Sequence, residues 1–78
     1  MTLLDLKCGE TVKVKTVGGG KALLERLRGF GVFVGRRFRL VKCGPFAGPL
    51  LLEDAANGAR VLLGRGMAGK VEVERESL

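Results

Sequence analysis

Residues 21–42, KALLERLRGFGVFVGRRFRLVK, carry the patterns of a helix, a turn and a strand within one short stretch. The first part has apolar residues at spacings of three and four, and these are Leu23, Leu24, Leu27 and Phe30. Such spacing places side chains on one face of a helix. Gly31 stands where the left-handed residue that ends many helices is expected, and Gly35 marks a second turn. We therefore expect a short helix that ends near a glycine and is followed by a turn.

The last part of this stretch alternates between apolar and basic residues. Phe38 and Leu40 alternate with Arg37 and Arg39, which predicts a strand with one apolar and one cationic face. The basic residues of the stretch outnumber its single acidic one, Glu25, and they are Lys21, Arg26, Arg28, Arg36, Arg37, Arg39 and Lys42. The rest of the chain has seven basic and seven acidic residues, so the formal net charge of +6 lies within residues 21–42.

The remaining sequence consists of short apolar runs separated by turn-forming residues. These runs predict strands near residues 12–17, 50–52, 61–63 and 71–73, and residues 64–69 leave room for no more than one helical turn. Asn57-Gly58 predicts a hairpin. Leu3, Leu4 and Leu6 are expected to pack across an open barrel end. The predicted fold is mainly β, a single domain over residues 1–78. It is a small SH3-like, partly open β-barrel of about five strands, with one short helix between the first and second strands.

The composition argues against catalysis. The chain contains no histidine, and its only serine, Ser77, lies next to the last residue, so serine and histidine mechanisms are excluded and a cysteine lacks its base. We therefore expect that the protein is not an enzyme and that it has no small-molecule substrate, no cofactor and no catalytic residue. Cys8 and Cys43 are interpreted as reduced, small buried apolar residues rather than metal ligands, because two thiolates without a histidine complete a tetrahedral site only with carboxylates or a second subunit. The chain has no bilayer-spanning stretch and no signal-peptide core, which predicts a cytoplasmic protein.

Several short motifs follow one another along nearly the whole chain. They are Leu3, Leu6 and Gly9, then Arg26-Leu27, Phe30-Gly31-Val32, Gly35 and Pro49, and finally Ala68, Val71 and Val73. In this order and spacing they resemble the FeoA family of small accessory proteins of bacterial ferrous iron uptake. Val34 departs from the family pattern by standing at a usual proline, and Cys8 stands near another. The resemblance implies an SH3-like fold, no catalysis, and action on the membrane-bound GTPase permease FeoB.

The predicted partner-binding residues come from the basic stretch, and they are Arg28, Phe33, Arg36, Arg37 and Arg39. Phe33 is expected to be an exposed apolar contact, whereas Phe30 and Phe38 are assigned to the core with the leucines. A row of arginines on a strand can also be no more than a solvated face. The segregation of the whole net charge favours a binding face, but both interpretations remain open.

Three functions of different kinds follow from these observations. The first is an interaction module for FeoB, which would meet the membrane only through that partner and for which self-association is left open. The second is a small nucleic-acid-binding barrel, which the positive charge favours and the scarcity of aromatic residues disfavours. The third is a stand-alone metal-sensing domain like the barrel appended to some iron-dependent repressors, here without the helix-turn-helix that reaches DNA.

Overall fold

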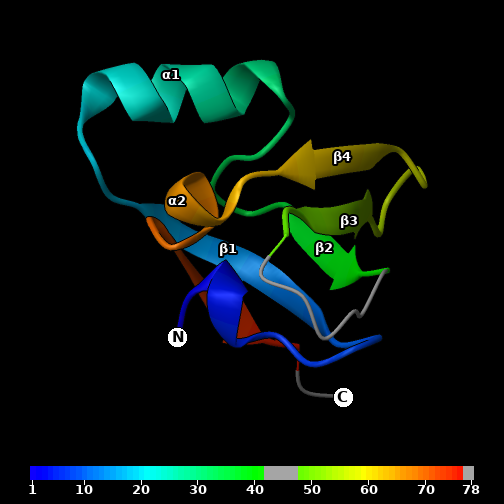
Figure 1. Cartoon of the computed structure of the whole chain (residues 1–78). Helices are drawn as coiled ribbons and strands as arrows, with labels where there is room; N and C mark the ends of the chain where they lie inside the picture. Colours follow the sequence, from blue (N-terminus) through cyan, green and yellow to red (C-terminus); the bar gives the residue numbers. More distant parts are fainter. Residues whose placement is uncertain (42–47, 77–78) are drawn as a thin grey trace.

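The structure is a computed structural model, and it describes residues 1–41 and 48–76. The order along the chain is η1 (Leu3–Asp5), β1 (Thr11–Val17), α1 (Lys21–Gly29), β2 (Arg37–Leu40), β3 (Leu50–Asp54), β4 (Arg60–Leu63), α2 (Arg65–Ala68) and β5 (Val71–Arg75). The strands form one sheet in the order β4-β3-β2-β1-β5, and all neighbouring pairs are antiparallel (Figure 1). This confirms the predicted small SH3-like β fold with one helix between the first two strands.

The core lies on one face of this strongly curved sheet. Cross-strand pairs such as Val12 with Phe38 and Leu40 with Leu52 place apolar side chains on the inner face, because successive residues of a strand point to opposite faces. The fully or nearly fully buried apolar residues are Leu3, Val12, Val14, Leu27, Val32, Phe38, Leu40, Leu52, Leu63, Ala68, Val71 and Val73. In β1, β2, β4 and β5 the alternation of apolar and polar residues predicted the buried face correctly, whereas the leucine run of β3 has no such alternation.

The start of the chain covers the free side of β5. Thr2 forms a β-bridge with Glu72, and the Val73 N–H donates to the Met1 carbonyl oxygen over 2.9 Å. A capping box of Thr2 and Asp5 holds η1, and Leu3 is fully buried. Of the three early leucines only Leu3 joins the buried core, since Leu4 is exposed and Leu6 is half-buried.

Helix α1 ends in a Schellman motif, and this arrangement overturns one prediction. Gly31 has a left-handed φ of 85°, its N–H donates to the Arg28 carbonyl, and the Val32 N–H donates to the Leu27 carbonyl over 2.9 Å. Leu27 and Val32 are both fully buried, so Val32 occupies the core position beside Leu27. Phe30, which was assigned to the core, is instead 47% exposed, because the helix ends at Gly29 and the chain reverses at Gly31.

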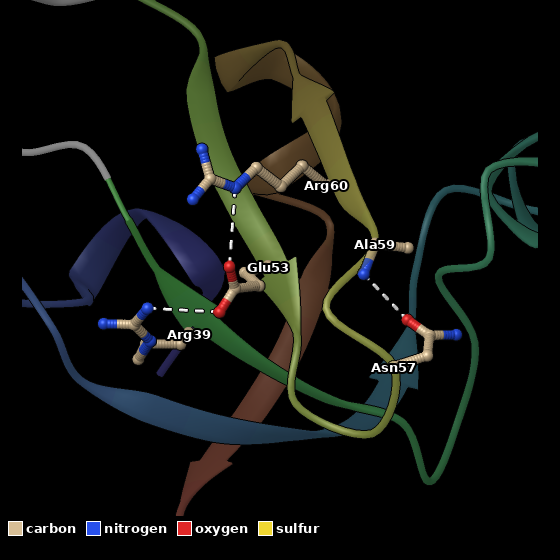
Figure 2. Close-up of polar contacts among 5 residues, drawn as sticks. All are labelled: Arg39, Glu53, Asn57, Ala59 and Arg60. Carbon is tan, nitrogen blue, oxygen red and sulfur yellow. Dashed lines mark hydrogen bonds and ion pairs between the residues drawn. The ribbon is translucent and has the colours of Figure 1, made fainter.

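Two further features differ in part from the sequence expectations. Cys8 was interpreted as a buried, reduced thiol, but it is exposed in the turn before β1 and is disulfide-bonded; Cys43 lies outside the described residues. The predicted Asn57-Gly58 hairpin is present, although only Gly58 takes a positive φ, of 75°. The Asn57 side-chain oxygen instead accepts from the Ala59 N–H over 2.8 Å (Figure 2).

Candidate functional site

The turn between α1 and β2 positions Phe33 and Arg36, two of the predicted partner-binding residues. The Arg36 N–H donates to the Phe33 carbonyl over 3.1 Å, and Gly35 has a φ of 94°, a conformation that favours glycine. The Gly35 N–H donates to the Val14 carbonyl, and the Val14 N–H donates to the Arg36 carbonyl. The turn is therefore tied to β1, and Val34 at its tip is 58% exposed.

Arg36 is paired and stacked within the chain. Its guanidinium forms an ion pair and hydrogen bond with Asp54, whose residue is only 4% exposed. It also lies over the half-buried Phe33 ring, 5.2 Å from the ring centroid, within cation–π range. Asp54 is inward because it pairs with Phe38 across β2 and β3 and lies two residues beyond buried Leu52. Sequence reasoning missed this buried carboxylate, because the continuous leucine run before it does not indicate which face of β3 is buried.

The pKa of the Asp54 carboxyl is lowered by its contacts in spite of its burial. Burial alone raises the pKa, since it disfavours the charged form. The N–H of Ala56 donates to Asp54 over 2.8 Å, and the Arg36 guanidinium donates and attracts. These interactions, with a further backbone hydrogen bond from Asn57, outweigh the desolvation and hold the pKa below its ordinary value. Arg36 and Asp54 therefore form a charged pair that joins β2 to the end of β3.

Arg37 and Arg39 point to the outer face of the sheet, as their spacing predicted, but both have acidic neighbours there. Arg39 donates to Glu53 over 3.1 Å, and Arg60 approaches the other oxygen of Glu53 at 3.4 Å (Figure 2). The hydrogen bond from Arg39 is the main cause that lowers the pKa of Glu53. The Arg37 Nε lies 3.7 Å from the Glu76 carboxylate. Arg36, directly before β2, and Arg37 and Arg39 within it are therefore all paired within the chain, and we call these three the β2 arginines.

The basic residues of α1 are in a different situation. Lys21, Arg26 and Arg28 are exposed, and none of them has an ion pair within residues 1–41 and 48–76. Arg26 and Arg28 lie in the last turn, where positive charge is favoured by the helix dipole. Arg28 was among the predicted partner-binding residues, whereas Arg26 was not. Phe30 and Val34, both well exposed, were also missed, because their exposure depends on where the helix ends.

The described residues offer no evident centre for chemistry. No group of three or more His, Cys, Asp or Glu residues within 1–41 and 48–76 could hold a metal ion. No helix in the same ranges is long and apolar enough to cross a membrane. The surface instead carries ion pairs, among them Arg75 at the end of β5 with Glu10 just before β1, and the exposed end of α1 carries cations and apolar side chains.

The fold places the molecule among small SH3-like β domains. Comparisons with known proteins identify its family. The FeoA domain family matches residues 1–75, so the chain belongs to the FeoA family. A protein of Methanocaldococcus jannaschii, assigned as an Fe(2+) transport protein A, is 31% identical over 68 residues, which span 87% of this chain and 78% of that protein. These matches confirm the FeoA family that was predicted from the sequence motifs.

Solved structures agree with the family assignment at the level of the fold. The crystal structure of an iron uptake regulatory protein (FeoA) superimposes with a TM-score of 0.85, at 24% identity, over 97% of this chain and 96% of that one. A manganese-dependent transcriptional repressor gives a TM-score of 0.86 at 23% identity. The match covers 97% of this chain but only 36% of the repressor, so it is a likeness of fold to one part of a longer protein.

Proposed function

We propose that this protein is a cytoplasmic accessory protein of ferrous iron transport that binds the membrane GTPase permease FeoB and modulates it without catalysis of its own. The observation that carries the proposal is the FeoA family match over residues 1–75. The related Methanocaldococcus protein, assigned to Fe(2+) transport, supports it. The absence of a metal-holding cluster within the described ranges suits a protein that acts on a transporter rather than on the iron itself.

The proposed contact is between the basic surface of this chain and an acidic surface of FeoB. The predicted residues Arg28, Phe33, Arg36, Arg37 and Arg39 would divide this work. Arg28, Arg37 and Arg39 are exposed and would meet carboxylates of the partner. Phe33 and Arg36 stack on each other and would hold the turn between α1 and β2 in shape. Cys8 is not part of this proposed contact. Its disulfide bond is an unusual feature for a protein of the reducing cytoplasm.

A binding experiment tests the proposal. The full chain, tagged at its N-terminus, is used to capture the purified cytoplasmic part of FeoB, with and without guanine nucleotide. We expect capture that weakens as salt increases, because exposed charge pairs are screened. Retention of DNA with no retention of FeoB would instead favour the nucleic-acid function. No FeoB capture at low salt in either nucleotide condition, with iron uptake unchanged in cells that lack the protein, would contradict the proposal.

A further inference from the structure

Helix α1 exposes most of its surface, and this surface is not neutralised within the described chain. Six of its nine residues are exposed and only Leu27 is fully buried. In Figure 1 the helix lies along the top of the molecule, on the opposite side from the N-terminus. Its cations Lys21, Arg26 and Arg28 face only one acidic residue of the same helix, Glu25, and none of the four takes part in an ion pair within residues 1–41 and 48–76.

The C-terminal end of this helix is held firmly, whereas its N-terminal end is weakly capped. Gly20 supplies no side-chain cap, and no acidic residue lies in the first turn. At the other end the Schellman motif and the buried Leu27–Val32 pair fix the backbone on both sides of Phe30. The exposed Phe30 ring therefore stands on an ordered backbone and not on a fraying end.

Two exposed charged and two exposed apolar side chains belong to this end of the helix and to the turn that follows it. Phe30 has helical dihedral angles, φ −89° and ψ −1°, so it shares a face with Arg26 four residues earlier. Val34 is held out at the tip of the next turn by the hydrogen bond between Arg36 and Phe33. We call the helix-end surface Arg26 and Phe30, which share this face, together with Arg28 on another side of the last turn and Val34 in the following turn.

We propose that the helix-end surface is a docking site for a protein surface that surrounds an apolar pocket with carboxylates, with Phe30 as the side chain that enters the pocket. This inference rests on the proposed function and names the part of the chain that would anchor the partner. Exposed aromatic side chains beside arginines are the usual composition of strong anchors in protein interfaces. Because Arg26 and Arg28 have no carboxylate to give up within the described chain, they can pair with a partner without breaking an existing ion pair.

A protein fits this surface better than a lipid or a nucleic acid does. Membrane-binding helices lay a wide apolar face into the bilayer, but the apolar face of α1 is turned into the core through Leu27. Single-stranded nucleic acid needs several stacking rings along a basic groove. Phe38 is buried and Phe33 is half-buried beneath Arg36, which leaves Phe30 as the one well-exposed ring among the described residues.

The test compares Phe30→Ser and Val34→Ser with Leu62→Ser, using the full chain and the purified cytoplasmic part of FeoB. Leu62 is the control, because it is 63% exposed and, next to buried Leu63 on β4, lies on the outer face of the sheet. We expect Phe30→Ser to weaken binding by about tenfold or more, mainly through faster dissociation. Val34→Ser should weaken it less, and Leu62→Ser should bind like the wild type. Thermal melts show that each variant remains folded, and Val34→Ser carries the test if Phe30→Ser does not fold.

Each other outcome has a distinct meaning. Equal binding by wild type, Phe30→Ser and Val34→Ser would overturn the docking site and leave the proposed function standing. If Phe30→Ser and Val34→Ser bind anionic vesicles or single-stranded DNA less well than the wild type but bind FeoB equally well, the surface is assigned to that other ligand and the inference is overturned. If the wild type itself does not bind FeoB, the proposed function falls and the docking site falls with it.

Discussion

The helical half and the strand half of residues 21–42 contain similar numbers of cations but use them differently. The β2 arginines are paired with Asp54, Glu53 and Glu76. The cations of α1 have no such pairs within the described residues. The difference arises because strand pairing brings acidic residues from β3 and the end of the chain beside β2, whereas α1 is not part of the hydrogen-bonded sheet. A cation of this stretch can therefore bind a partner without breaking an existing ion pair only where the fold brings no carboxylate to it.

The largest expected effect comes from removing the contact that holds the helical half in place. Leu27→Ala should lower the free energy of unfolding by about 2–5 kcal/mol, because Leu27 is fully buried and its loss leaves a cavity. That range approaches the total stability of a small domain. Thermal denaturation with circular dichroism measures it. A melting temperature within a few degrees of wild type would mean that the position of α1 does not depend on Leu27.

The next effect separates the paired from the unpaired arginines. Arg36→Met should destabilise the fold by about 3 kcal/mol, because it leaves the buried Asp54 carboxylate without its cation. Arg28→Met should change stability by no more than about 0.5 kcal/mol, as is usual for surface positions. Urea unfolding of both variants makes the comparison. Equal stabilities would show that the Arg36–Asp54 pair adds nothing to the fold.

Acid should weaken the strand half through Asp54. Because its pKa in the folded protein lies below the ordinary value of about 3.9, ionised Asp54 stabilises the fold above about pH 4. This contribution is lost as the pH falls through the lowered pKa. Thermal melts between neutral pH and about pH 2 should therefore show a smaller acid-induced loss for Asp54→Asn than for wild type. Identical pH profiles would contradict the assigned role of this carboxylate.

A smaller stability effect than that of Arg36→Met is expected at the outer pairs of β2. Arg37→Gln with Arg39→Gln should reduce stability by about 1 kcal/mol or less, since exposed ion pairs contribute little. The melting temperature of this double variant measures the effect directly. A loss as large as that of Arg36→Met would mean that the outer pairs are as important to the fold as the inner one.

Much of the fold could be predicted from local sequence patterns. Period-two alternation identified the strands, the glycines at 31 and 35 do take positive φ, and the Asn57-Gly58 hairpin is present. The core assignment failed at Phe30, because a helix period cannot tell by itself at which residue the chain reverses. The paired state of the β2 arginines could not be predicted either. Arg36 meets Asp54 and Arg37 meets Glu76 only through strand register, which depends on residues far away in the sequence.

The comparison is tested most directly by removing the same number of positive charges from α1 and from β2. Arg26→Gln with Arg28→Gln and Arg37→Gln with Arg39→Gln each remove two positive charges, so their effect on the overall charge is the same. Affinity for the cytoplasmic part of FeoB should fall further for the pair in α1, because those arginines have no carboxylate within the described chain, whereas the strand pair is already neutralised. An equal or larger loss of affinity for the strand pair would contradict the account.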